Sequence, residues 1–289
     1  MKILKEARCI IGEGPIWNTK EQKLYFTNGR GNEICAYDFC LDKVSCRSLP
    51  FGVAAFAFDK KNNLIVSHSK GVHILNSDNT LSQIYDNSKY QIQYANDMKV
   101  GPDGAIYVGT QSSKRIGVSD KVDGKLYRIS SNGEVEILLD GLILSNGMEW
   151  SLDERKFYHT DSDTGIIKEY DFDKSGKITF TGRQVLVPRV DGFTIGNDEC
   201  LYVVCWGLGH VAVVETRKLE VIDYIKIPTD IPTSCGFCGE NMDFLAITTA
   251  SLNVDIQADE NAGFTILKKM DIRGRKPYFY ANKRSKEKQ

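Results

Sequence analysis

A short apolar strand motif recurs six times along the sequence at a nearly constant spacing. One apolar residue marks each copy: Leu24, Leu64, Ile106, Phe157, Leu201 and Leu245. Successive markers are 40, 42, 51, 44 and 44 residues apart. Repeats of roughly 40–50 residues built from short strands are typical of propeller blades. We therefore predict an all-β fold, a six-bladed β-propeller, formed as a single domain by residues 1–289.

The segments around the marker strands have the pattern expected of four-stranded blades. A turn rich in Asn, Asp and charged residues, such as residues 59–63, precedes a marker strand. A third strand and a more polar fourth strand follow, as in residues 125–129 and 135–139. The last unit lacks a fourth strand after Phe264, while residues 3–9 form a strand without a unit. We predict that this N-terminal strand closes the last blade. A β-sandwich or jelly roll is the alternative fold, but it does not explain the period.

Composition excludes some classes of function. The hydrophobic content of 42% over 289 residues is enough for a large buried core. A formal net charge of −1 gives no basis for nucleic acid or membrane partners. No apolar run approaches the ~18 residues of a membrane span, and the N-terminus lacks the apolar segment of a secretory signal. The sequence leaves the oligomeric state open.

The eight cysteines lack the spacing of a disulfide scaffold. We therefore expect eight free thiols in a cytoplasmic protein. Cys235 and Cys238 have the C-x-x-C form of a redox or zinc site. On a strand, however, residues three apart face opposite sides, so their sulfur atoms should diverge.

Polar residues occupy an equivalent position in most of the predicted inner strands, four residues before the last apolar residue. We call these six residues the axial ring: Glu13, Ala54, Asn96, Asn146, Asp191 and Ser234. If inner strands line a central channel, the ring brings two carboxylates and two carboxamides together. Two anions in a desolvated site repel each other unless a cation lies between them. The alternative is that these residues only begin strands, where Asn and Asp are common.

The donor set indicates which ion would bind. Oxygen donors without sulfur or imidazole favour Ca²⁺, with Mg²⁺, Mn²⁺ or a catalytic Zn²⁺ as alternatives. With only three or four protein ligands, water would complete the coordination of this one divalent cation. Such an incomplete ligand set is typical of a catalytic metal.

Four short motifs resemble the signature of the SMP-30/gluconolactonase/luciferin-regenerating-enzyme-like family. They are Gly12-Glu13-Gly14-Pro15, Asn96-Asp97, Ser145-Asn146-Gly147 and Asp191-Gly192. The similarity extends over nearly the whole chain, and it implies a six-bladed propeller with divalent-metal-dependent lactonase activity. It also implies that Glu13, Asn146 and Asp191 are the metal ligands and that Asn96 contacts the substrate.

Two residues depart from the family's pattern. Tyr94 stands where the family often has a sugar-binding Arg, and Asp120 stands where a substrate-binding Glu is found. Both are candidate substrate-binding residues. The departures concern the preference for a sugar, not the metal site.

We expect a gluconolactonase-like enzyme that hydrolyses a small, sugar-acid-type lactone. The metal would polarise the carbonyl group and Asp191 would act as general base. The alternative is a non-catalytic propeller that binds calcium or a partner, because fold alone does not decide function.

Overall fold

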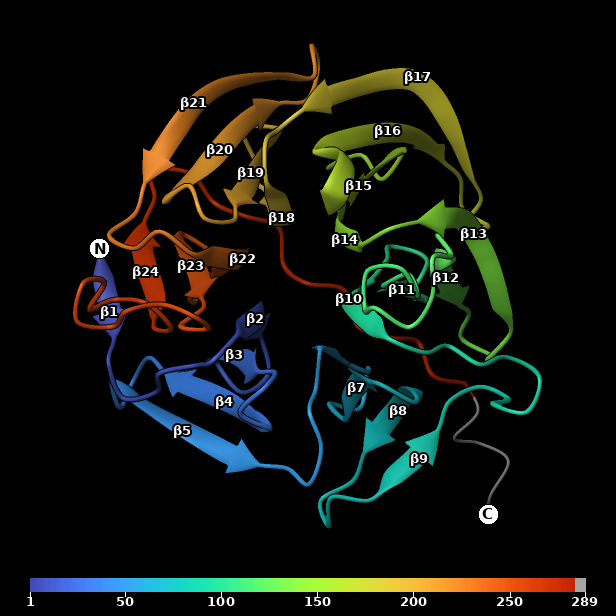
Figure 1. Cartoon of the computed structure of the whole chain (residues 1–289), viewed down its shortest axis with the longest axis horizontal. Coiled ribbons are helices and arrows are strands. Elements are labelled where there is room, and N and C mark those ends of the chain that lie inside the picture. The colour runs from blue at the N-terminus through green and yellow to red at the C-terminus, as the bar shows by residue number, and fades with distance from the viewer. Residues whose placement is uncertain (284–289) are drawn as a thin grey trace.

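The structure, a computed structural model, describes residues 1–283, which form six four-stranded antiparallel sheets around a central axis (Figure 1). Five sheets follow the chain from the axis outwards, whereas the sixth has the order β22–β23–β24–β1. These sheets are the blades of a six-bladed β-propeller. The predicted fold is confirmed, and a sandwich or jelly roll is excluded.

The first three blades lie within the N-terminal half of the chain. Blade 1 comprises β2 (Gly12–Asn18), β3 (Lys23–Asn28), β4 (Glu33–Asp38) and β5 (Lys43–Ser48). Blade 2 comprises β6 (Ala55–Phe58), β7 (Leu64–His68), β8 (Gly71–Leu75) and β9 (Leu81–Gln83). Blade 3 comprises β10 (Ala95–Val100), β11 (Ile106–Thr110), β12 (Gly124–Ile129) and β13 (Val135–Leu142).

The other three blades complete the ring. Blade 4 comprises β14 (Ser145–Trp150), β15 (Lys156–Asp161), β16 (Ile166–Phe172) and β17 (Ile178–Leu186). Blade 5 comprises β18 (Val190–Ile195), β19 (Cys200–Cys205), β20 (His210–Glu215) and β21 (Glu220–Lys226). Blade 6 comprises β22 (Pro232–Cys238), β23 (Phe244–Thr249), β24 (Thr265–Lys269) and β1 (Lys2–Leu4).

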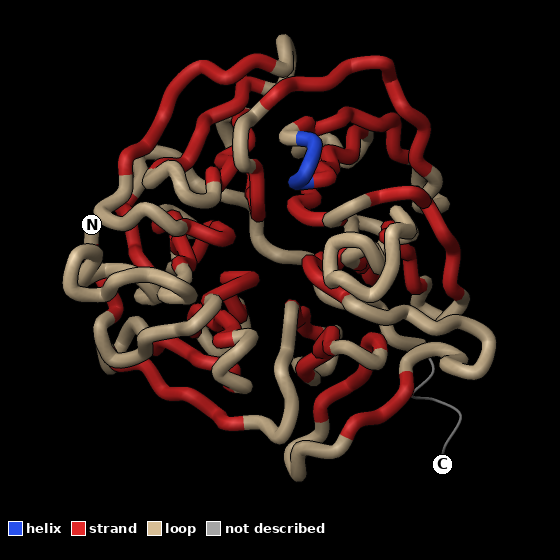
Figure 2. Tube along the Cα trace, in the orientation of Figure 1, coloured by secondary structure: helices blue, strands red, loops and turns tan. Residues whose placement is uncertain are grey.

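Helical structure is confined to one 3₁₀ turn, η1 (Ser162–Thr164), within the described residues (Figure 2). Accordingly, no helix in residues 1–283 is long and apolar enough to cross a membrane.

The turn before each marker strand contains one residue in the left-handed region of φ. These residues are Gln22, Asn62, Gly104, Glu154, Glu199 and Met242, with φ between 56° and 73°. A left-handed residue at the end of a short hairpin loop lets the chain reverse while matching strand twist. Because this turn recurs before each marker strand, the Gly, Asn, Asp and charged residues typical of it predict the position of each blade in the sequence.

The N-terminal strand closes the ring as predicted. β1 pairs with β24 in antiparallel register, with Ile3 opposite Ile266. The strand is shorter than expected and ends at Leu4, after which the Cys9 N–H donates to the Gly263 carbonyl oxygen at 2.7 Å. The first strand of the chain thus completes the last blade of the ring.

The core fills the spaces between neighbouring blades. At the contact of blades 3 and 4, the rings of Tyr107 and Trp150 are 4.8 Å apart at an angle of 71°. Both residues are fully buried, as is Trp17 in blade 1. Because burial of each large apolar side chain contributes about 1.5–3 kcal/mol, blade contacts are a major source of stability.

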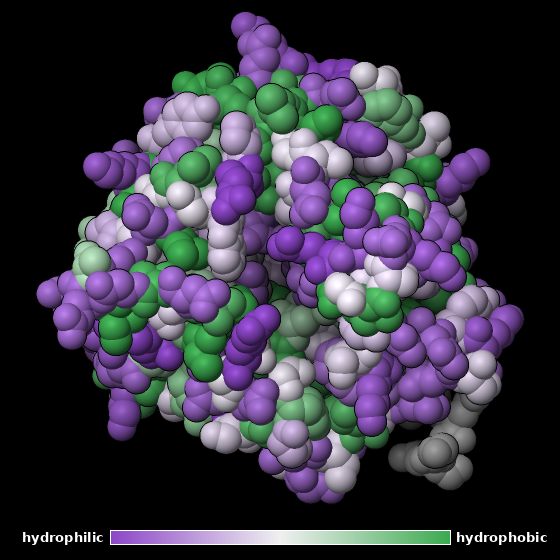
Figure 3. Space-filling view, viewed as in Figure 1, coloured by the Kyte–Doolittle hydropathy of each residue, from purple (hydrophilic) through white to green (hydrophobic). Residues whose placement is uncertain are grey.

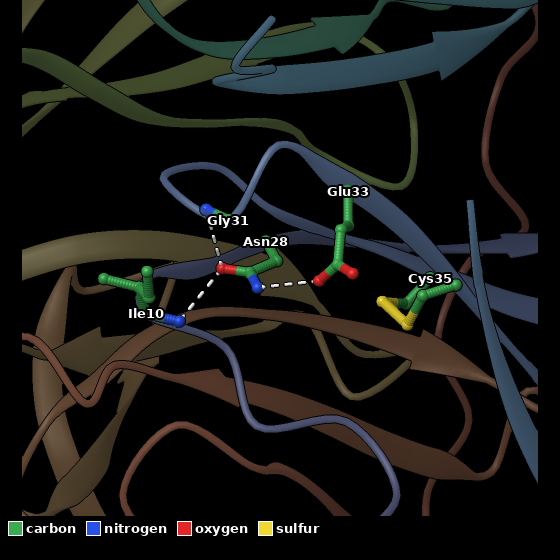
Figure 4. Close-up of a disulfide and its surroundings, with 6 residues drawn as sticks. Ile10, Asn28, Gly31, Glu33 and Cys35 are labelled. Carbon is green, nitrogen blue, oxygen red and sulfur yellow. Dashed lines mark hydrogen bonds between the residues drawn. A yellow bond between two sulfur atoms is a disulfide. The ribbon is translucent and has the colours of Figure 1, made fainter. Parts of the chain in front are cut away.

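The expectation of eight free thiols is wrong, because Cys35 and Cys46 form a disulfide (Figure 4). The two residues are direct partners on the adjacent strands β4 and β5, with Cα atoms 4.0 Å apart. The two cysteines are 11 residues apart in the sequence, a spacing that does not by itself indicate a disulfide. The register of the hairpin places them opposite each other. The cysteines therefore no longer support the expected cytoplasmic location.

The other cysteines are free thiols, including the C-x-x-C pair. Cys235 and Cys238 are both buried on β22, and their pKa values are raised, chiefly by burial. Cys235 and Cys238 are thus free thiols, as predicted.

The segment from Met270 to Lys283 crosses the axis behind the inner strands in the view of Figure 1. Gly274 N donates to the carbonyl oxygen of Met242, in the β22–β23 turn of blade 6, at 2.8 Å, and Tyr280 N donates to that of Phe58, at the end of β6 in blade 2, at 2.9 Å. Arg275 reaches Glu149 and the carbonyl oxygen of Trp150 on the inner strand of blade 4. This segment therefore covers the channel at the end away from the axial ring.

Candidate metal centre and substrate cavity

A cavity of about 1050 Å³ opens at the axis, on the face where the inner strands begin. Five axial-ring residues line it, namely Glu13, Ala54, Asn96, Asn146 and Asp191. The sixth, Ser234, is buried and is not among the lining residues. Figure 3 shows hydrophilic side chains gathered around this central hollow. Residues far apart in the sequence are thus brought to one site.

Local irregularities in the inner strands aim the ring residues into the cavity. Register shifts occur at the ring positions of β2, β10, β14, β18 and β22. A β-bulge bends a strand and redirects side chains, and bulges are frequent beside active sites. β6 has regular pairing, and its ring residue is Ala54.

Glycines beside the ring residues allow the inner strands to approach closely. A Cβ atom on Gly147 would lie 2.4 Å from the Phe193 ring and 2.5 Å from the Asp191 carbonyl oxygen. One on Gly192 would lie 2.3 Å from Ser234 Oγ. The motifs Asn146-Gly147 and Asp191-Gly192 therefore combine a polar side chain that faces the cavity with a small residue that lets neighbouring strands converge.

Hydrogen bonds orient the two asparagines of the ring. The Asn146 amide donates to Asp191 Oδ1, and its own Oδ1 accepts from Gly147 N at 3.1 Å. Asn96 Nδ2 donates to the Ser145 carbonyl oxygen at 3.2 Å, and Asn96 Oδ1 accepts from Gln111 Nε2 at 3.4 Å. These hydrogen bonds fix the orientation of both amide groups at the cavity.

Asp97 is a third carboxylate of the cavity, and the sequence prediction missed it. In a regular strand Asn96 and Asp97 would face opposite sides. The register shift between Ala95 and Met98 lets both line the cavity. The signal available in the sequence was the Asn-Asp pair itself, but only the bulge gives Asp97 this direction.

Burial raises the pKa values of all three carboxylates, and neighbouring carboxylates raise those of Glu13 and Asp191 further. Burial is the largest cause for Glu13, followed by the charges of Asp191 and Asp97. Burial and then the charge of Asp97 raise the pKa of Asp191, against the opposing effects of Asn146 and Arg115. Within residues 1–283, no salt bridge neutralises any of the three. Concentrated negative charge of this kind is what a bound cation relieves.

The residues present fit a divalent cation. Glu13, Asp191 and Asn146 supply carboxylate and amide oxygens, the donors preferred by Ca²⁺ and Mg²⁺. Asp97 adds negative charge close by. The ligand roles predicted for Glu13, Asn146 and Asp191 remain predictions, to which the convergence of their side chains on one cavity lends support.

The outer wall of the cavity comes from loops, and its residues were also missed. Arg30, Arg115 and Arg189 line it together with Gln111 and Trp206. Asp163 in η1 is a further lining residue, at the polar turn between β15 and β16. Loop residues carry no repeat pattern, so the alignment of strands could not find them.

Tyr94 and Asp120 are not among the residues that line the cavity. Tyr94 has φ of 54°, and its carbonyl oxygen accepts from Gln111 N at 3.0 Å. Asp120 is exposed in the β11–β12 loop, where Arg115 is the lining residue. Their predicted contacts with substrate stay predictions.

Two histidines lie near the ring. His159 is buried and bonds to Ser145 Oγ at 2.8 Å, and burial lowers its pKa to about 3. His68 lines the cavity, and its Nε2 lies 3.2 Å from His73 Nδ1. Burial and His73 lower the pKa of His68 to about 4, so this residue adds no positive charge at neutral pH.

Comparison with known proteins places the fold and the ring motifs in one family. Residues 11–251 match the model of the SMP-30/gluconolactonase/LRE-like region. The chain belongs to this SMP-30/gluconolactonase family. The matched segment includes all six axial-ring residues.

Relatives match the chain over most of its length. Regucalcin of Gallus gallus is 27% identical over 291 residues, covering 95% of this chain and 96% of the relative. YvrE of Bacillus subtilis (strain 168), provisionally named a sugar lactone lactonase, is 28% identical over 255 residues, 85% of each chain. The crystal structure of a calcium-binding protein, regucalcin from Agrobacterium tumefaciens, matches with a TM-score of 0.84, 20% identity and 96% coverage of both chains. Membership of this family supports a lactonase-type activity for the protein.

Proposed function

We propose that the protein is a metal-dependent lactonase that hydrolyses a small, sugar-acid-type lactone at the axial ring. The observation that carries the proposal is the convergence of Glu13, Asn146 and Asp191 on one open cavity. A purely structural role would not require three unpaired carboxylates, including Asp97, to line a space large enough for a ligand. The name of the Bacillus subtilis relative agrees with this activity.

A divalent cation held by Glu13, Asn146 and Asp191 would polarise the lactone carbonyl and stabilise negative charge on its oxygen. Asp191 would accept the proton of the attacking water as general base. The water oxygen bonds to the carbonyl carbon, and the bond from that carbon to the ring oxygen breaks. The ring oxygen would then take the proton held by Asp191 and become the hydroxyl group of the product acid.

Asn96 is suited to orient the substrate. Gln111 and the backbone of β14 hold its side chain at the cavity, and an amide both donates and accepts hydrogen bonds. A fixed amide can therefore position a substrate hydroxyl group or the attacking water. Such positioning lowers the entropic part of the barrier.

The decisive experiment measures release of acid from a panel of aldonolactones with a pH indicator, with and without a chelator. Asp191→Asn should lower kcat by about 10²–10⁴-fold, because it removes the base and weakens metal binding. Asn146→Ala should lose activity mainly through the metal, so excess metal should partly restore it. Asp223→Asn is the matched control, since it makes the same change at an exposed residue of the outer strand β21, away from the cavity.

Three results would change the proposal. Full activity after complete chelation would exclude a catalytic metal. Full rescue of Asp191→Asn by saturating metal would show that Asp191 only holds the ion. Saturable calcium binding without turnover of any lactone would instead favour the alternative, a non-catalytic calcium-binding propeller. The Agrobacterium tumefaciens regucalcin is described as a calcium-binding protein, which agrees with this alternative.

A further inference from the structure

The outer wall of the cavity carries more positive than negative charge. Arg30 lies in the β3–β4 turn, Arg115 in the β11–β12 loop and Arg189 in the link between β17 and β18. Asp163 is the acidic residue of this wall. A ligand whose reacting group lies at the acidic ring therefore extends its other end towards guanidinium groups.

Arg115 is held at the cavity by an ordered loop, drawn as a tan coil beside the axis in Figure 2. The buried Ser112 anchors this loop: its N–H donates to the Ile143 carbonyl oxygen at 2.8 Å, and its Oγ accepts from Arg115 N at 3.1 Å. Ser113 fastens the other side through Asp123 at 2.6 and 2.7 Å. The backbone at Arg115 is thus fixed by neighbouring bonds.

The guanidinium group of Arg115 has no hydrogen bond or ion pair within residues 1–283. Arg115 lines the same cavity as the ring residues Asn146 and Asp191. Its guanidinium group is therefore available to a ligand that is bound at the ring. In contrast, Arg128 and Arg183 are paired with Asp103 and Glu169.

Arg189 is held at the cavity by hydrogen bonds to Trp206. Its Nε donates to the Trp206 carbonyl oxygen at 3.2 Å, and its own carbonyl oxygen accepts from Trp206 N at 2.8 Å. Trp206, Leu186 and Leu252 also line the cavity. The wall thus offers apolar surface as well as positive charge.

The size of the cavity agrees with a ligand larger than a simple sugar lactone. Its volume of about 1050 Å³ is at the upper end of ligand pockets, which are roughly 300–1,000 Å³. A divalent cation would offset most of the charge of Glu13, Asp97 and Asp191. The guanidinium groups would then dominate the field that an approaching ligand meets.

We infer that the lactone hydrolysed here carries a second, anionic group, a carboxylate or a phosphate, which Arg115 binds while Arg30 and Arg189 attract it. A guanidinium group binds the paired oxygens of either anion through two parallel hydrogen bonds. The inference rests on the proposed lactonase function, because it names the substrate class for that site.

Two matched pairs of lactones test this inference. δ-Gluconolactone is compared with its terminal phosphate ester. γ-Gluconolactone is compared with glucaro-γ-lactone, in which a carboxylate replaces the terminal hydroxymethyl group. The readout is the ratio of kcat/KM for the anionic lactone to that for its neutral partner. Because Asp191 acts on both members of a pair, any effect of a variant on Asp191 cancels in this ratio.

The wild type should prefer the anionic member of at least one pair by about tenfold or more, and Arg115→Gln should lower that ratio about tenfold. Arg155→Gln is the control, because Arg155 is exposed in the β14–β15 turn at the far end of the inner strands. It should leave the ratio unchanged. Added salt should lower the rate for the anionic lactone more than for the neutral one.

The outcomes separate this inference from the proposed function. Hydrolysis of the neutral lactones without anion preference, or an equal effect of Arg115→Gln on both members, would overturn the inference and leave the lactonase standing. No hydrolysis of any of the four would count against the lactonase itself. Preference in one pair only would support the inference and identify the anion as phosphate or carboxylate.

Discussion

Arg275 fastens the C-terminal segment to the lower end of the channel, and replacing it with alanine should measurably destabilise the protein. Its Nη1 donates to the carbonyl oxygens of Trp150 and Ser151 at 3.2 and 3.1 Å, and its Nη2 bonds to Glu149. The Glu149 side chain is only 6% exposed, while that of Arg275 is 18% exposed. These contacts join residues more than 120 positions apart in the sequence.

The magnitude follows from what Glu149 keeps. Removing one partner of a buried ion pair generally costs about 3–5 kcal/mol. Here Lys99 Nζ remains 2.9 Å from Glu149 Oε2, and Trp150 N still donates at 3.0 Å. The carboxylate is therefore not left alone, but charge-assisted bonds worth about 1.5–3 kcal/mol each are lost. We expect Arg275→Ala to lower the free energy of unfolding by about 3 kcal/mol.

Equilibrium unfolding in urea measures this effect. With a slope of about 3 kcal/mol per molar urea, the midpoint should fall by about 1 M. Arg273→Ala is the matched control, because Arg273 is exposed two residues earlier on the same segment. It should shift stability by less than about 0.5 kcal/mol. Equal midpoints for the two variants would refute the reasoning.

The pH dependence gives a second test of the same contact. Burial alone would raise the pKa of Glu149, but Lys99 and Arg275 hold it below its usual value of 4.5. Because the pKa of Glu149 is lower in the folded than in the unfolded state, its ionisation stabilises the protein at pH values above the unfolded pKa. This contribution is lost as the pH falls through the folded pKa. The difference between wild type and Arg275→Ala should therefore be full at neutral pH and shrink below about pH 4.5. A difference that is constant down to acid pH would exclude an ionic contribution.

Two further predictions concern the inner strands and the cysteines. Gly147→Ala should destabilise the protein by about 1–3 kcal/mol and lower lactonase activity by tenfold or more, because the new Cβ atom would push β14 away from Phe193 and Asp191. Urea unfolding measures the first effect and the pH-indicator assay the second. Wild-type activity would contradict the close packing. Thiol titration of the denatured, unreduced protein should find six thiols and, after reduction, the eight of the sequence; eight before reduction would contradict the Cys35–Cys46 disulfide.

The sequence by itself determined the propeller and most of the axial ring. Both depend on patterns that are local and repeated: an apolar strand, a turn rich in Gly, Asn, Asp or charged residues, and a polar ring position in five of the six inner strands. The spacing of Leu24, Leu64 and their equivalents is visible because each blade folds from consecutive residues. Equivalent positions in a closed ring must meet, so Glu13, Asn146 and Asp191 could be grouped without coordinates.

Only the tertiary structure decided the features that break the repeat. A bulge turns Asp97 into the cavity beside Asn96, although strand alternation places adjacent residues on opposite faces. Hairpin register sets Cys35 opposite Cys46. Arg115 lines the cavity through the fold of its loop, and Arg275 meets Glu149 because the chain crosses the axis after the last blade. Each of these contacts depends on where a non-repeating segment runs in space, which no periodic pattern in the sequence encodes.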